Sequence, residues 1–247
     1  MKYLNLFLFL FSLTIANGQT AREIIQKADE KTRGAKSAIT EMKITIVRPK
    51  WTREMELKTW SKGEDFSLTL IQAPAKDKGT TFLKRDKEIW NYIPSIERSI
   101  KLPPSMMMQS WMGTDLTNDD LVKESSVLND YDHKILGDSI IQNRNCYKIE
   151  LIPKENAPVV WGKIILFIDK KDFIQLRSEM YDEDGYLVNI MNSSGIKLLG
   201  GKMLATKMEV IPVEEEGQKT VMEIKSIEFD KEIKDSFFTV KNMKKLR

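Results

Sequence analysis

Apolar and polar residues alternate with a period of two along most of this chain, from Ala38 onwards, and turn residues interrupt the alternation. In the first run, Met42, Ile44 and Ile46 share one face, and Pro49 ends the run. Because successive side chains of a strand point to opposite faces of a sheet, this pattern is typical of half-buried antiparallel strands. It predicts strands at 40–48, 53–61, 66–72, 80–85, 88–93, 99–102, 133–138, 146–153, 163–169, 174–182, 186–193, 203–211 and 220–228.

The segments between and before these runs carry matching signals. Gly200 and Gly201, for example, mark a hairpin turn, because glycine readily adopts the positive φ that such turns need. A helix is expected at 20–33, where Thr20 can cap the first turn and Glu23 completes a capping box. Gly34 ends this helix.

These elements predict one domain over residues 19–247 with a mainly β fold. We expect a half-open antiparallel β-barrel of about ten or eleven strands, closed on one side by the N-terminal helix and by a mid-chain loop and helix that act as a lid. A strongly curved sheet that closes incompletely leaves space on its concave side.

Residues 1–18 are typical of a secretory signal peptide. Lys2 precedes an apolar run that is too short to span a bilayer comfortably, and Ala16 and Gly18 supply small residues at positions −3 and −1 of a cleavage site. No cysteine follows this run to carry a lipid anchor, and no second long apolar segment occurs. We therefore expect a periplasmic protein without a lipid anchor or a transmembrane helix in its mature form.

The charge balance and the cysteine count exclude several classes of protein. The chain has 39 basic and 36 acidic residues, and this near balance argues against a nucleic-acid-binding protein. The single cysteine, Cys146, has no partner in the chain for a disulfide and lies in an alternating run. Stability must therefore come from one well-filled apolar core.

The stretch from Met106 to Leu121 departs from the strand pattern. Met106, Met107, Met108 and Met112 lie there beside Trp111. Methionine is flexible and polarizable, so it fills irregular apolar spaces and recurs at surfaces that accept different apolar partners. Two interpretations remain open: a lid over an apolar cavity, or a plug that permanently completes the core. A short helix is expected at 118–124 because Asn118 can cap it.

The sequence contains few residues that could carry catalysis. The chain has one histidine, His133, and no nucleophile motif accompanies it. His133 and Cys146 alone do not make a zinc site. Asp115, Asp119 and Asp120 lack the spacing of a calcium loop, and no glycine-rich phosphate loop follows a strand. We therefore expect neither an enzyme nor a metal site, and no cofactor.

Three motifs carry a resemblance to a known family. They are Trp-Asn-Tyr-Ile-Pro at 90–94, Arg98, and Met-Gly-Thr-Asp-Leu-Thr at 112–117 with the following Asp-Asp-Leu. Together they resemble the outer-membrane lipoprotein-sorting family, the LolA-like proteins of bacterial periplasms, and its longer, largely uncharacterised branch in particular. Thr114 and Leu116 depart from that branch, which often has serine and phenylalanine there. The resemblance covers essentially the whole mature chain.

The resemblance implies a half-open barrel whose apolar cavity accepts acyl chains. Better-known members carry lipoproteins from an inner-membrane export complex to an outer-membrane receptor, and relatives of this branch are often linked to RND-type transporters. The implied ligands are therefore acyl chains of lipoproteins or lipids. The implied partners are an RND-type or ABC-type inner-membrane export complex and an outer-membrane acceptor.

Two functions are consistent with these features. The first is a periplasmic carrier that binds acyl chains and moves them toward the outer membrane. The alternative is a sensor or adaptor of an RND-type transporter or an envelope-stress system that uses the same fold without transport. In either case the residues expected to line the cavity and its lid are Phe82, Trp90, Tyr92, Met106, Met107, Met108, Trp111, Met112, Leu116 and Leu121.

Overall fold

The structure, a computed structural model, describes residues 19–246 except 87, 119, 121–126, 156 and 158, and it leaves out the side chains of residues 32 and 33. The expected signal peptide at 1–18 and the expected site residue Leu121 lie outside the described residues. Most of the helix expected at 118–124 lies outside them as well.

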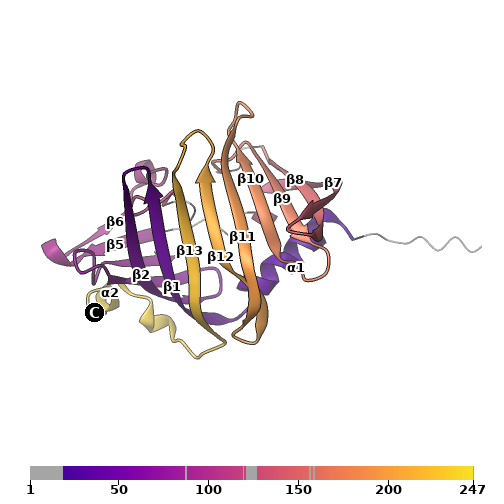
Figure 1. The fold of residues 1–247 in the computed structure, drawn as a ribbon. Coiled ribbons are helices and arrows are strands. Elements are labelled where there is room, and N and C mark those ends of the chain that lie inside the picture. The colour runs from indigo at the N-terminus through magenta and orange to yellow at the C-terminus, as the bar shows by residue number, and fades with distance from the viewer. Residues whose placement is uncertain are drawn as a thin grey trace, which may run out of the picture.

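One antiparallel sheet of 13 strands forms the body of the protein (Figure 1). Its strand order is β6-β5-β4-β3-β2-β1-β13-β12-β11-β10-β9-β8-β7, so the described sheet is open, with β6 and β7 at its two edges. The strands are β1 (Ser37–Arg48), β2 (Trp51–Lys62), β3 (Phe66–Ala73), β4 (Thr81–Arg85), β5 (Glu88–Ile93), β6 (Arg98–Lys101), β7 (Tyr131–Ile141), β8 (Arg144–Pro153), β9 (Lys163–Asp169), β10 (Gln175–Tyr181), β11 (Leu187–Leu199), β12 (Lys202–Pro212) and β13 (Lys219–Phe229).

The mainly β, half-open fold is confirmed, but the expected number of ten or eleven strands was too low. Each run that the alternation indicated corresponds to one strand. The short strands β4 and β6, of five and four residues, are full members of the sheet and pair with β5 on either side. An open sheet can gain such strands at its edge because no fixed number is needed for closure.

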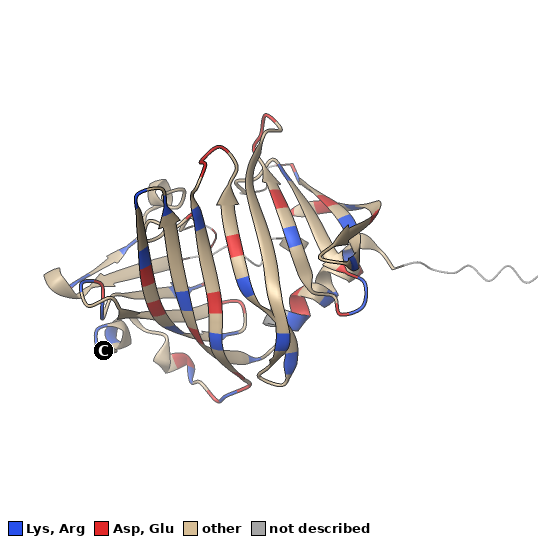
Figure 2. Cartoon of the chain, in the orientation of Figure 1, with Lys and Arg blue, Asp and Glu red and all other residues tan. Residues whose placement is uncertain are grey.

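Strand β1 lies next to the middle strand of the sheet, β13, and pairs with it on one side and with β2 on the other. Ile44 pairs with Met55 and Met222, and all three side chains are buried. The intervening Lys43 faces the opposite side of the strand, where it forms an ion pair with Glu54 at 2.6 Å. Figure 2 shows charged residues of both signs spread over the strands, as this alternation requires.

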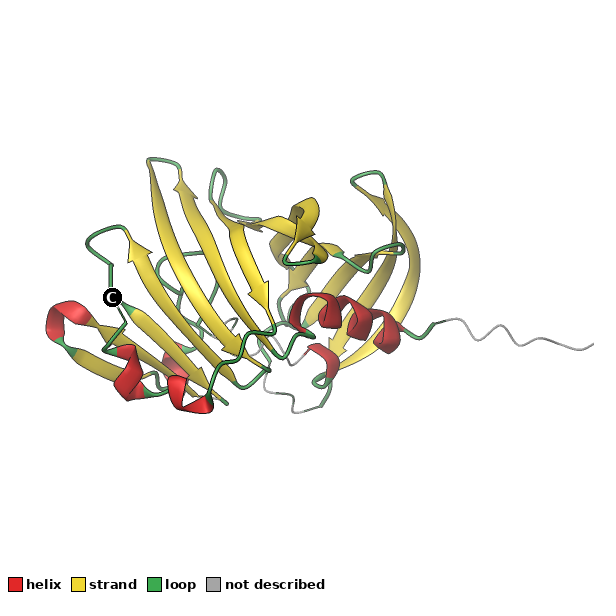
Figure 3. Ribbon diagram, turned by 90° about the horizontal axis from the view of Figure 1, so that it is seen from below, coloured by secondary structure: helices red, strands yellow, loops and turns green. Residues whose placement is uncertain are grey.

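Helix α1 (Ala21–Arg33) lies on the concave side of the curved sheet (Figure 3). The predicted capping box is present, because Thr20 Oγ1 accepts from the Glu23 amide and the Glu23 carboxylate accepts from the Thr20 amide. Ile24 and Ile25 are buried and pack with residues of β7 to β10. The helix therefore covers one half of the concave side.

The C-terminal segment covers the convex face of strands β2 to β5. It contains the 3₁₀ turn η4 (Asp235–Phe237) and the short helix α2 (Val240–Met243). Phe238 and Met243 are fully buried there against Leu68 and Leu83. Two further 3₁₀ turns, η1 (Pro94–Ile96) and η2 (Pro104–Met106), flank β6 in the chain.

Candidate functional site

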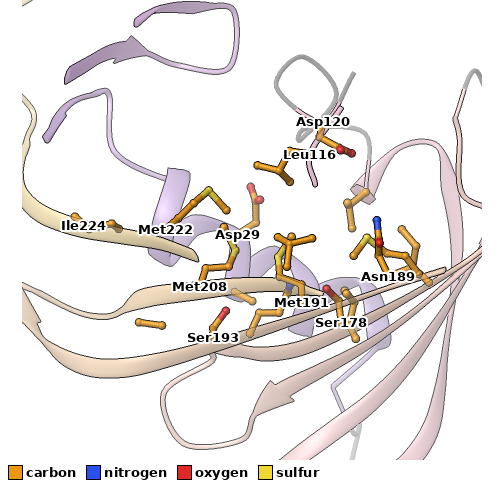
Figure 4. Close-up of a pocket in the computed structure, with 18 of the residues that line it drawn as sticks. Asp29, Leu116, Asp120, Ser178, Asn189, Met191, Ser193, Met208, Met222 and Ile224 are labelled. Carbon is orange, nitrogen blue, oxygen red and sulfur yellow. The ribbon is translucent and has the colours of Figure 1, made fainter. Parts of the chain in front are cut away.

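A cavity of about 590 Å³ lies between the concave face of the sheet and α1. Nearly every strand from β1 to β13 contributes lining residues, and α1 contributes Ile25, Ala28, Asp29 and Lys31. The volume lies within the range of roughly 300–1,000 Å³ that is usual for small-molecule sites. Figure 4 shows the side chains of both walls pointing toward a shared space.

Methionines from five different strands contribute to the cavity wall. One lies on β1 and one on each of the last four strands, β10 to β13: Met42, Met180, Met191, Met208 and Met222. Unbranched, polarizable side chains can repack around apolar ligands of different shape. The wall therefore suits a long, flexible hydrocarbon better than a rigid ring system.

Two groups of buried residues meet at this cavity. One joins α1 to β7–β10 through residues such as Ile24 and Leu166, and the other joins β1–β3 to Trp111 and Phe82. Met191 packs against both groups. The cavity is therefore the incompletely filled space between two halves of one core, which the curvature of the sheet holds apart.

The mid-chain segment closes one part of the cavity as a tight hairpin. Ser110 and Thr117 form an isolated bridge, and the Trp111 amide donates to the carbonyl of Leu116 at 2.8 Å. The Trp111 side chain is 3% exposed and meets the ring of Phe82 edge-on, with centroids 5.4 Å apart. The hairpin thus inserts an aromatic anchor into the core.

A largely buried ion pair fixes this hairpin to the sheet. The Arg48 guanidinium donates to both carboxylate oxygens of Asp115, at 2.9 and 3.2 Å, and also to the carbonyl of Gly113. Thr220 Oγ1 donates to the Asp115 carboxylate at 2.7 Å and accepts from the Asp115 amide at 2.9 Å. Arg53 donates to the carbonyl of Met112 at 2.6 Å. Three strands therefore hold the loop, which favours the plug for residues 110–117.

The structure distributes the expected site residues over three places. Phe82, Trp111 and Leu116 line the cavity, and Met112 packs against the same core group. Met106 and Met107 pack instead beside Ile89 and Leu102, and Met108 is 55% exposed. Two residues lie on the opposite face, under the C-terminal segment: Trp90 and Tyr92.

The sequence interpretation assigned the methionine signal to the mid-chain segment and missed the methionines of the sheet. Met191 lies on β11, Met208 on β12 and Met222 on β13. The alternation of residues along each strand could therefore have shown which face of the sheet each methionine occupies. These methionines face a cavity because the two halves of the core lie apart. The alternation of residues does not encode that distance.

The two residues weighed as catalytic candidates occupy ordinary structural positions. The ring nitrogen Nε2 of His133 lies 2.8 Å from the carbonyl oxygen of Val127. Cys146 is fully buried, and burial raises the pKa of its thiol, which disfavours the reactive thiolate. Within the described residues, no group of three or more His, Cys, Asp or Glu is arranged to hold a metal ion.

None of the helices in the described part of the chain is both long and apolar enough to cross a membrane.

An open antiparallel sheet curved around an apolar cavity, with a helix on its concave side, defines the LolA-like class of folds, and three solved structures share this architecture. The first is a DUF1329 family protein from Desulfovibrio piger, with a TM-score of 0.83 and 23% sequence identity over 90% of this chain and 97% of that one. The second is a LolA superfamily protein from Nitrosomonas europaea, with a TM-score of 0.77 and 22% identity over 91% of this chain and 99% of that one. The third is a domain named as an outer membrane lipoprotein-sorting protein from Vibrio parahaemolyticus, with a TM-score of 0.76 and 21% identity over 91% of this chain and 98% of that one.

A family model described as an uncharacterized protein matches residues 63–245, and the chain belongs to that family. The predicted resemblance to the LolA-like proteins, and to a longer uncharacterised branch of them, is confirmed. No curated protein matches the chain.

Proposed function

We propose that this protein is a periplasmic carrier that binds acyl chains of lipoproteins or lipids in its cavity and moves them toward the outer membrane. The observation that carries the proposal is the methionine-lined cavity of about 590 Å³ between α1 and the sheet. The likeness of the fold to a lipoprotein-sorting domain supports it.

The energetics of acyl binding fit such a cavity. Each buried methylene group contributes about 0.8 kcal/mol, so a chain that buries about ten methylenes gains roughly 8 kcal/mol before entropy costs. The flexible methionine wall lowers the cost of adapting to chains of different length. Within this proposal, the bound acyl chain contacts Phe82, Trp111 and Leu116 where the hairpin closes the cavity.

The same proposal includes the cellular context. The segment 1–18 directs export, residues 19–247 act as one binding domain, and an inner-membrane export complex loads the acyl chain that an outer-membrane acceptor receives. These assignments rest on the sequence pattern at the N-terminus and on the family resemblance.

The test is to fill the cavity from one position and leave its neighbour as a control. Ser193 lines the cavity, whereas Ser194, the next residue of β11, points to the other face of the strand. We expect Ser193→Phe to weaken the binding of a hydrophobic fluorescent probe, and its displacement by palmitate, by about tenfold or more. Ser194→Phe should bind as the natural protein does.

Thermal unfolding of both variants shows whether the fold is kept. If Ser193→Phe is folded and still binds the probe with natural affinity, the cavity is not the acyl site and the proposed function is wrong.

A further inference from the structure

Three uncharged polar side chains stand among the methionines of the cavity wall: Ser178 on β10, and Asn189 and Ser193 on β11 (Figure 4). Ser178 is 4% exposed, so it is buried from bulk solvent although it lines the cavity. An apolar site gains nothing from these groups unless a ligand uses them.

The register of the strands interleaves these groups with methionines. Ser178 pairs with Met191, and Asn189 pairs with Met180. Ser193 pairs with Met208 on the next strand. Because diagonal neighbours in an antiparallel sheet lie about 7–8 Å apart, Ser178 lies within reach of the same ligand group as Asn189 or Ser193.

The side chains of these three residues form no hydrogen bond with any other described residue. Three threonine hydroxyls of the cavity wall are satisfied within the protein. Thr206 Oγ1 donates to the carbonyl of Gly195 at 2.8 Å, and the hydroxyls of Thr59 and Thr69 lie 3.0 Å apart. The three side chains of the polar stripe on β10 and β11 therefore differ from these threonines, which need no ligand to satisfy them.

Ligand binding changes the environment of the stripe. In the empty cavity, water can satisfy the two hydroxyls and the amide. A hydrocarbon chain that displaces this water leaves them buried without partners, which is unfavourable. A ligand that carries a hydrogen-bonding group at this depth avoids that loss.

We propose that Ser178, Asn189 and Ser193 bind a neutral ester or amide group of the lipid, so that the protein prefers chains carrying such a linkage to plain hydrocarbon chains. The carbonyl oxygen accepts from the Ser178 hydroxyl and from one diagonal neighbour on β11, either the Ser193 hydroxyl or the Asn189 amide. This inference rests on the proposed function, because it assigns the chemical class of the ligand of the same cavity.

A charged group is disfavoured at the stripe. Two basic residues of the lining are engaged elsewhere: Lys31 donates to the carbonyl of Asp172 at 2.6 Å, and Lys207 pairs with Glu209 at 3.3 Å. A carboxylate or phosphate at this position would be buried without a counterion, which is costly. The linkage recognised here is therefore uncharged.

The test compares two ligands that differ in one carbonyl group. Monopalmitoylglycerol carries an ester, and hexadecylglycerol has an ether at the same position. We expect the natural protein to bind the ester about tenfold more tightly, measured by displacement of a hydrophobic fluorescent probe. In the triple variant Ser178→Ala, Asn189→Leu and Ser193→Ala, the two ligands should bind equally, and binding of the ether should be kept or improved.

Ser194→Ala, on the other face of β11, is the matched control and should keep the preference for the ester. If the natural protein does not prefer the ester, or if the triple variant keeps the full preference, the inference is wrong while acyl binding stands. If neither ligand displaces the probe from the natural protein, the proposed function fails together with the inference. The single variants, each measured for thermal stability, replace the triple variant if it does not fold.

Discussion

The anchoring of the 110–117 hairpin gives the sharpest test of the plug interpretation. Asp115 receives two hydrogen bonds from Arg48 and one from Thr220. The side chains of Arg48 and Asp115 are 14% and 9% exposed. Removing one partner of a buried, hydrogen-bonded ion pair typically costs about 3–5 kcal/mol, because the remaining charge stays buried.

We therefore expect Asp115→Ala to lower the free energy of unfolding by about 3 kcal/mol or more. For a chain of this size, a loss of 3 kcal/mol corresponds to a drop in melting temperature of roughly 6–12 °C. Urea unfolding followed by circular dichroism measures the free energy, and thermal unfolding gives the second value.

Glu54→Gln is the matched control, because Glu54 pairs with Lys43 at the surface and its side chain is 57% exposed. Exposed pairs contribute about 0–1 kcal/mol, so this variant should unfold almost as the natural protein does. If Asp115→Ala also costs less than about 1 kcal/mol, the hairpin is not a fixed part of the core, and the moving lid is the better interpretation.

Two further predictions concern titratable groups. Burial raises the pKa of Cys146, so its thiol should resist a thiol reagent at pH 8 in the folded protein and react fully in urea; fast labelling of the folded protein would contradict this placement. The hydrogen bond from Arg144 lowers the pKa of Asp172, so the pair stabilises the fold above the unfolded pKa of the carboxyl, and this contribution is lost as the pH falls through the folded pKa. Asp172→Asn should therefore be less stable than the natural protein at pH 7, with a difference that closes at acidic pH; a gap that is independent of pH would refute it.

The alternation of apolar and polar residues predicted the strands, because a half-buried strand must place its apolar residues on one face. It located each of the 13 strands, although β11 extends to Leu199 and not to residue 193. Gly195, with a positive φ of 64°, interrupts the alternation within β11 and hides its continuation. Local pattern thus finds strands but underestimates one that contains an irregular residue.

The candidate site was predicted less completely. The motif around Trp111 led to Trp111 and Leu116, which line the cavity together with Phe82, the site residue expected on the strand at 80–85. Trp90 and Tyr92 were assigned to the concave side, but their parity in β5 places them under the C-terminal segment. A tryptophan on a strand can be buried on either face of a sheet. Which face buries it depends on the segment that packs against that face.

The sequence by itself determined the mainly β architecture, the capped N-terminal helix and the family, since these follow from local periodicity, capping residues and motifs. The tertiary structure decided that all 13 strands pair in one sheet with β6 and β7 at its edges, and that Arg48 and Thr220 anchor Asp115. It also decided that methionines of distant strands share one wall with three polar side chains that form no hydrogen bond with another described residue. These features depend on contacts between residues far apart in the chain, which pairing and curvature create and local patterns do not specify.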